Sequence, residues 1–195
     1  MNAIMSEKGF TLVELLTAMV PSLIVLGAVT STFILQNNSY EQQAHIVEMQ
    51  ENVRAGMQMM TRELVMAGYD PSGATGAGIV SANANSIRFT IDLNGDGDVS
   101  DSNEDVTYAL DPTDKQLTRK STAIDTATPL AENIQGLSFT YYDSNNSTTS
   151  VIGKMRRITI QLTARTREPD PNYSNNNGYR TRTLTTDVSP RNLGL

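Results

Sequence analysis

The sequence contains no cysteine and only one histidine. Without cysteine the chain has no disulfide framework, no thiolate metal site and no thiol nucleophile. A nucleophile-and-base pattern and a glycine-rich phosphate loop are also missing. The single histidine, His45, stands among polar neighbours on a predicted helix, where a solvent-exposed position is expected. These absences argue against an enzyme.

Positive charge is scarce in the first part of the chain and concentrated in the last. The formal net charge is -6 at pH 7, which argues against non-specific nucleic-acid binding by the whole surface. Residues 70–150 hold 12 acids and 4 bases, whereas residues 151–195 hold 8 bases and 3 acids. At 195 residues, the chain suits one domain of ordinary size plus one extra element.

Charge is absent altogether from residues 15–35, an apolar run of 21 residues. An α-helix needs about 20 residues to cross the hydrocarbon core of a bilayer, so this run predicts a transmembrane helix. A secretory signal peptide would have a shorter apolar region followed by a small-residue cleavage site, and none follows Leu35. An acid at Glu14, at the edge of the run, is not explained by a simple anchor.

The start of the apolar run reads Lys8-Gly9-Phe10-Thr11-Leu12-Val13-Glu14-Leu15. This segment closely resembles the cleavage and methylation motif of type IV prepilins and type II secretion pseudopilins. The resemblance implies that residues 1–9 are a leader, which a prepilin peptidase removes by cutting between Gly9 and Phe10. It also implies that the new amine of Phe10 is methylated. Other pilins or pseudopilins, the peptidase and the inner membrane are then the expected partners.

The resemblance assigns Glu14 a role in filament assembly. A carboxylate in hydrocarbon is tolerable only if a cation meets it, and the free amine of a neighbouring Phe10 would do so in a filament. Further along the helix, Pro21 removes one hydrogen bond and clashes with the carbonyl of Thr17, so a kink is expected there. Nearby hydroxyl groups would partly satisfy the freed carbonyl.

Beyond Leu35 the sequence is polar, but apolar residues continue at steps of three and four. This spacing predicts an amphipathic helix over residues 36–68, following the transmembrane and filament-core helix of residues 10–35. Gly68 followed by Pro71 indicates its end. The apolar stripe, expected to pack on a sheet, consists of Ile46, Met49, Val53, Met57, Met60, Leu64 and Ala67.

Residues 69–195 are predicted to form a β-rich periplasmic or extracellular head. A loop to Asn85 is followed by segments in which apolar residues alternate with polar ones. The fold class is therefore α+β, with one antiparallel sheet covered by the amphipathic half of the helix, and the resemblance implies that this is a pilin fold. Predicted strands lie at residues 86–91, 106–110, 115–120, 137–141, 158–164 and 179–186. Arg157, Arg165 and Arg167 form a basic stripe, expected to be a solvated sheet face.

An acidic loop follows the first predicted strand and reads Asp92-Leu93-Asn94-Gly95-Asp96-Gly97-Asp98. It matches the start of a calcium loop of the EF-hand type, with Gly97 allowing the sharp turn. The expected closing Glu at the twelfth residue is Asn103, and Glu104 comes one residue later. A structural Ca²⁺ site in a hairpin and an ordinary acidic turn both remain open. The candidate ligands are Asp92, Asn94, Asp96, Asp98 and Glu104.

Within the pilins, the head resembles the PilW-type minor pilins, relatives of the J-type pseudopilin. The resemblance rests on the strand pattern from Ser86 onward, on Tyr141-Tyr142-Asp143 and on Val188-Ser189-Pro190-Arg191-Asn192. It implies a subunit that is anchored in the inner membrane and then enters a filament, near the tip, to initiate or cap assembly. A J-type pseudopilin and a tip subunit whose head binds DNA, a surface or a secreted substrate are the alternatives.

Overall fold

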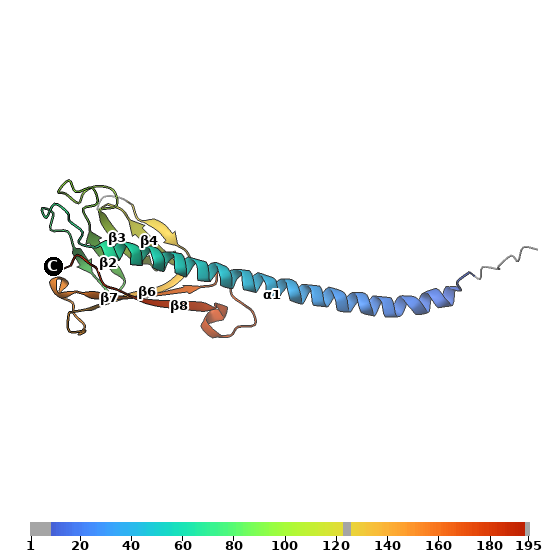
Figure 1. Cartoon of the computed structure of the whole chain (residues 1–195). Helices are drawn as coiled ribbons and strands as arrows, with labels where there is room; N and C mark the ends of the chain where they lie inside the picture. The colour runs from blue at the N-terminus through green and yellow to red at the C-terminus, as the bar shows by residue number, and fades with distance from the viewer. Residues whose placement is uncertain (1–8, 123–125, 194–195) are drawn as a thin grey trace, which may run out of the picture. The chain divides into compact units, whose positions relative to one another are not determined.

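The computed structural model describes residues 9–122 and 126–193 of the chain (Figure 1). The chain divides into two compact units, one ending at Ala44 and the other beginning at His45. One α-helix, α1 (Leu12–Met66), supplies residues to both units. The predicted leader, residues 1–9, lies outside the described residues except for Gly9.

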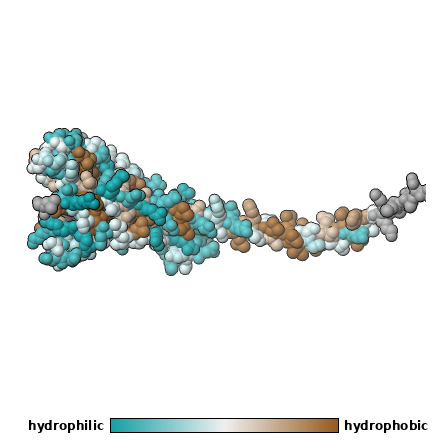
Figure 2. Space-filling view, in the orientation of Figure 1, coloured by the Kyte–Doolittle hydropathy of each residue, from teal (hydrophilic) through white to brown (hydrophobic). Residues whose placement is uncertain are grey.

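In the first unit, α1 carries apolar side chains on all of its sides, and these side chains are exposed. Figure 2 shows them as a hydrophobic surface along this part of the helix. The described residues contain one helix that is long and apolar enough to cross a membrane, and it is α1. A helix that is apolar all round needs lipid or protein to cover it, because water does not solvate such a surface favourably.

In the second unit, α1 buries one narrow stripe, as the sequence predicted. Of the seven stripe residues, six are buried and Ile46 is partly buried against the same core. The helix ends at Met66, and Gly68 follows with a φ of +82°, a conformation that favours glycine. The Gly68 N–H donates to the Thr90 carbonyl at 3.0 Å, which joins the end of the helix to the neighbouring sheet.

In the described residues, eight strands form two antiparallel sheets, of five and three strands. The first sheet has the order β1-β2-β3-β4-β5, and its strands are β1 (Ile79–Ala82), β2 (Ser86–Thr90), β3 (Asp105–Asp111), β4 (Gln116–Lys120) and β5 (Thr128–Ala131). The second has the order β6-β7-β8, with β6 (Ile134–Tyr142), β7 (Arg157–Arg165) and β8 (Thr181–Val188). Short 3₁₀ helices lie at η1 (Ile152–Lys154) and η2 (Asn175–Gly178).

The sequence predicted a single sheet. This part of the prediction is wrong, because the strands form two sheets. The division falls between β5 and β6, where Asn133 has a φ of +58° and turns the chain sharply. Strands β1 and β5 were not predicted. Each has four residues, too few for a clear alternation, and Pro129 lowers the strand propensity of β5.

Both sheets pack against α1 in one core. A Cβ atom placed on Gly56 would lie 2.9 Å from Leu117 Cδ2 on β4 and 3.3 Å from Leu162 Cδ2 on β7. Glycine at this position lets the helix contact both sheets closely. The α+β architecture, a long helix packed on antiparallel β-structure, is confirmed.

One polar cluster joins the helix to the first sheet. The carboxylate of Glu63 on α1 accepts hydrogen bonds from the Tyr108 hydroxyl at 2.6 Å and from Arg119 Nε at 3.0 Å. The side chain of Tyr108 is fully buried, and those of Glu63 and Arg119 are 16% and 12% exposed. Burial, together with the hydrogen bond to Glu63, raises the pKa of Tyr108 well above its usual range.

We expect Glu63→Ala to destabilise the folded chain by about 2–4 kcal/mol, because it leaves a buried hydroxyl and a mostly buried guanidinium without their acceptor. Glu51→Ala, on an exposed position of the same helix, should change stability by less than about 0.5 kcal/mol. Urea denaturation of the detergent-solubilised chain measures both values. Equal stabilities for the two variants would contradict a structural role for this cluster.

Candidate functional site: the helix start and the acidic loop

A reciprocal capping box forms at the start of α1. The carboxylate of Glu14 accepts hydrogen bonds from the Thr11 N–H at 2.9 Å and from the Thr11 hydroxyl at 2.8 Å. In return, the Glu14 N–H donates to Thr11 Oγ1 at 3.3 Å. The sequence analysis overlooked this pair, although Thr and Glu three positions apart are its known signature. In a single chain, the Glu14 carboxylate is therefore bonded to the first turn of its own helix.

The predicted cleavage junction lies just outside the helix. Gly9 and Phe10 precede α1 in non-helical backbone, and Phe10 is 91% exposed. A Cβ atom on Gly9 would meet nothing within 4 Å. The junction is thus free of contacts with the described residues that would hinder a peptidase.

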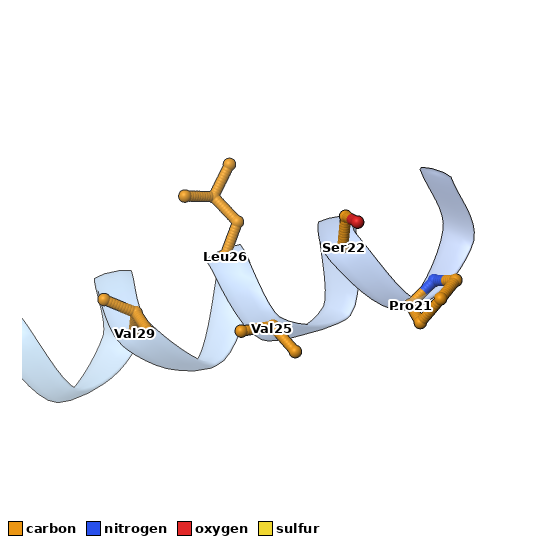
Figure 3. Close-up of a pocket in the computed structure, with 5 residues that line it drawn as sticks. All are labelled: Pro21, Ser22, Val25, Leu26 and Val29. Atoms are coloured by element: carbon orange, nitrogen blue, oxygen red, sulfur yellow. The ribbon is translucent and has the colours of Figure 1, made fainter. Parts of the chain in front are cut away.

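Around Pro21, α1 continues without interruption. The Ser22 hydroxyl donates to the Ala18 carbonyl at 2.8 Å, one residue beyond the Thr17 carbonyl that Pro21 cannot satisfy. Figure 3 shows Pro21, Ser22, Val25, Leu26 and Val29 along successive turns, where they line an open, largely apolar hollow. The residues that line this hollow carry one hydroxyl, that of Ser22, and no ionisable group.

The acidic loop connects β2 to β3, which pair as an antiparallel hairpin. The carboxyl groups of Asp92 and Glu104 are buried at its base. Asp92 accepts from the N–H groups of Gly95 at 2.6 Å and Gly97 at 3.3 Å. Glu104 Oε1 accepts from the Leu93 N–H at 2.8 Å. The hairpin context expected from the sequence is thus correct.

The remaining polar residues of the loop are exposed and bonded to one another. The Asn94 amide donates to carboxylate oxygens of Asp96 and Asp101, each at 2.9 Å. Asp98 accepts hydrogen bonds from the N–H and the hydroxyl of Ser100. The bond from the backbone N–H, followed by the bond from the hydroxyl, lowers the pKa of Asp98. In this conformation, no group of three or more His, Cys, Asp or Glu side chains in the described part of the chain is placed to hold a metal.

A second loop, residues 70–76, contacts the acidic loop and was not singled out in the sequence. Its carboxylate, Asp70, accepts from the Thr75 hydroxyl at 2.6 Å and from the N–H groups of Gly73 at 2.7 Å and Thr75 at 3.0 Å. Ser72 donates to both Asp70 and Asp92. The run Asp70-Pro71-Ser72-Gly73 carried a usable signal, because Asp before Pro and Gly is typical of a side-chain-closed turn.

The basic face of the second sheet is largely engaged within the chain. The guanidinium of Arg157 lies 3.8 Å from the centre of the Tyr142 ring and 3.2 Å from Asp187. Arg165 stacks on Tyr179 at 4.2 Å, and Arg167 lies 4.0 Å from Glu48. His45 is 3.8 Å from the same glutamate. The stripe of Arg157, Arg165 and Arg167 is therefore engaged within the chain, and these contacts do not favour a nucleic-acid site.

The fold and the helix start together define a pilin-like protein. A solved type IV-like pilin from Thermus thermophilus matches the structure with a TM-score of 0.50. The match covers 74% of this chain and 97% of that one at 12% sequence identity, so it establishes a likeness of fold. No curated protein matches the sequence.

The family is identified by the sequence of the second unit, which includes the end of α1. The model of the family "prepilin peptidase-dependent protein B" matches residues 42–189. The chain therefore belongs to the prepilin peptidase-dependent protein B family. The family and the fold are structural and not enzymatic, in agreement with the absence of catalytic motifs in the sequence.

We expect Asp70→Asn to lower the melting temperature at neutral pH. The hydrogen bond from the Thr75 hydroxyl, with those from Ser72 and the backbone of residues 73 and 75, holds the pKa of Asp70 well below its usual value. A lowered pKa in the folded state contributes stability above the unfolded-state pKa of about 3.9, and this stability is lost as the pH falls towards the folded-state value.

The difference in melting temperature between wild type and Asp70→Asn should therefore be greatest above about pH 5 and should shrink below about pH 4. Asp114→Asn, at an exposed turn of the first sheet, serves as the control and should show little difference at either pH. If the difference in melting temperature stayed constant from pH 7 to pH 3, the stabilising role given to the ionised Asp70 carboxylate would be wrong.

Proposed function

We propose that this chain is a PilW-like minor pilin, which is processed by a prepilin peptidase and helps to initiate or cap a type IV pilus-like filament. One observation carries the proposal: an apolar helix, exposed on all sides, that begins with a single carboxylate at Glu14. Such a surface must be covered by lipid before assembly and by other helices within a filament. Family membership and the pilin-like fold support the same role.

The sequence of steps follows from the chemistry of the helix start. While the leader is attached, Phe10 has a peptide nitrogen and no charge. Cleavage between Gly9 and Phe10 creates an amine, which is protonated at neutral pH. In a staggered filament this amine would meet the Glu14 carboxylate of a neighbour, and both charges would be neutralised in a water-poor core.

For Glu14, pairing with a neighbour would bring a charged partner to a carboxylate that the single chain bonds only through Oε2. In the single chain its carboxylate is hydrogen-bonded by the backbone and hydroxyl of Thr11. A charged amine is a stronger donor than these neutral groups, because charge-assisted hydrogen bonds are roughly twice as strong as neutral ones. The added charged partner would therefore favour the assembled state.

The head would contribute by its shape and stability and not by chemistry. Its glycine-mediated packing on α1 and its polar cluster at Glu63 make it a compact unit that can be carried on the helix. The J-type pseudopilin assignment shares all of these features. A head that binds DNA, a surface or a secreted substrate has less support, because Arg157 and Arg165 of the second sheet already have partners.

We expect mass spectrometry of filaments sheared from the producing cells to find a chain that begins at methylated Phe10. The ratio of this chain to the most abundant pilin should lie far below one, as for a subunit confined to a filament end. Membranes of cells without prepilin peptidase provide the control and should retain residues 1–9. Filaments containing uncleaved chains would contradict processing, and a near-equimolar ratio would contradict a minor role.

We expect Glu14→Val to insert in the membrane and fold, but to enter filaments at least tenfold less than wild type. The loss of a desolvated ion pair costs a few kcal/mol, and 1.4 kcal/mol already corresponds to a factor of ten. The ratio of filament to membrane protein, measured by immunoblotting, tests this.

Two control variants separate pairing with a neighbour from local capping. Thr11→Ala removes the cap hydroxyl and keeps the carboxylate, so it should assemble nearly as well as wild type. Glu41→Val makes the same change on the same helix outside the apolar run and should also assemble. If Thr11→Ala were as defective as Glu14→Val, the carboxylate would act as a helix cap and the pairing argument would fail.

A further inference from the structure

The acidic loop holds more negative charge than basic side chains of the described residues neutralise. Residues 92–105 contain six acids, and no base lies between Ile91 and Lys115. One of the six, Asp105, is paired with Arg88, whose Nε donates to it at 2.7 Å. The other five have no ion-pair partner in the described residues. Like charges at this spacing repel one another unless a cation is present.

A buried oxygen at the base of the loop gives independent evidence for a ligand. Glu104 is 1% exposed, and its Oε1 accepts from the backbone N–H groups of Leu93 and Asn94. Its other oxygen, Oε2, is buried without a hydrogen-bond partner. A buried carboxylate oxygen without a partner is costly, and the bonds made by Oε1 place the group against the loop. A bound cation would satisfy this oxygen.

The loop supplies the type of ligand that one class of metal requires. Its possible metal ligands are all side-chain oxygens, from carboxylates, two amides and hydroxyls, and the chain has no cysteine. Calcium takes six to eight oxygen ligands in flexible geometry, whereas magnesium demands a near-ideal octahedron and keeps several waters. Gly95 and Gly97, with φ of +77° and +90°, allow the backbone to turn inward as such loops require.

We propose that this loop binds one calcium ion. The side chains of Asp92, Asn94, Asp96 and Asp98 are the alternating ligands, and Glu104 Oε2 closes the site in place of the expected twelfth residue. The exposed carboxylates now bond to nearby amides, so ion binding requires them to rotate from these local hydrogen bonds. Asn94 already holds Asp96 and Asp101 towards each other across the loop.

The site would fasten the end of α1 to the first sheet. The Asp92 N–H donates to the Tyr69 carbonyl at 2.7 Å, just after the helix. Ser72 also donates to Asp92, and Pro71 and Ala74 lie within 4 Å of where Cβ atoms of Gly95 and Gly97 would be. An ion that orders the acidic loop therefore also orders residues 69–74. In a head without disulfides, this is a cross-link between segments distant in sequence.

The test uses the full mature chain in detergent micelles, freed of metal with chelator. Millimolar CaCl₂ should raise the melting temperature by several degrees over chelator at matched ionic strength, and MgCl₂ should raise it less. Calorimetric titration should give one site with a dissociation constant of roughly 0.1–1 mM, as in extracellular modules. Equal melting temperatures with calcium and with chelator would overturn the proposal.

Three variants locate the effect. Asp96→Asn, at an exposed position, and Glu104→Gln, which keeps the Oε1 acceptor, should each lose most of the calcium-dependent shift. Asp143→Asn is the control, because Asp143 accepts from the N–H groups of Asn145 and Ser147 in a similar exposed turn. It should keep the full shift. If Glu104→Gln does not fold, Asp96→Asn decides, and a full shift in that variant would assign the effect to another site.

Discussion

The structure depends on the burial of one narrow stripe of α1 between two sheets. Each sheet has a single apolar face, and neither face is covered unless the helix lies against it. The stripe is rich in methionine, whose flexible side chain fills irregular space between surfaces of different curvature. Gly56 brings the backbone close to β4 and β7 at the centre of this contact. The same helix must be apolar all round in its first half, so its sequence changes character near residue 36.

Periodic features of the fold could be predicted because they depend only on neighbouring residues. The stripe of α1 and the alternation in β2, β3, β6 and β7 all appear in the sequence. The number of sheets could not be predicted in this way. Alternation tells which side chains are buried, but strand pairing depends on long-range contacts and on one turn at Asn133. The four-residue strands β1 and β5 are formed by pairing to longer neighbours and carry little signal of their own.

The candidate sites show the same difference between local patterns and features of the tertiary structure. The spacing of acids from Asp92 to Asp98 and the Thr11–Glu14 capping pair are local patterns, and both could be read directly. The burial of Glu104 and the closure of the 70–76 loop by Asp70 come from tertiary structure. Only the structure reveals that Asp92 is bonded to Ser72, 20 residues earlier in the chain.

Under the proposed function, the Thr11–Glu14 pair has a consequence for a subunit before it enters a filament. A lone carboxylate at the edge of hydrocarbon would otherwise drive a chain to find any cation, including a wrong partner. Because the carboxylate is already bonded to its own helix, such a subunit would need no second partner for Glu14 while it waited in the bilayer. Its supply and the moment of its use would then be under separate control, by synthesis and by the machinery that assembles the filament.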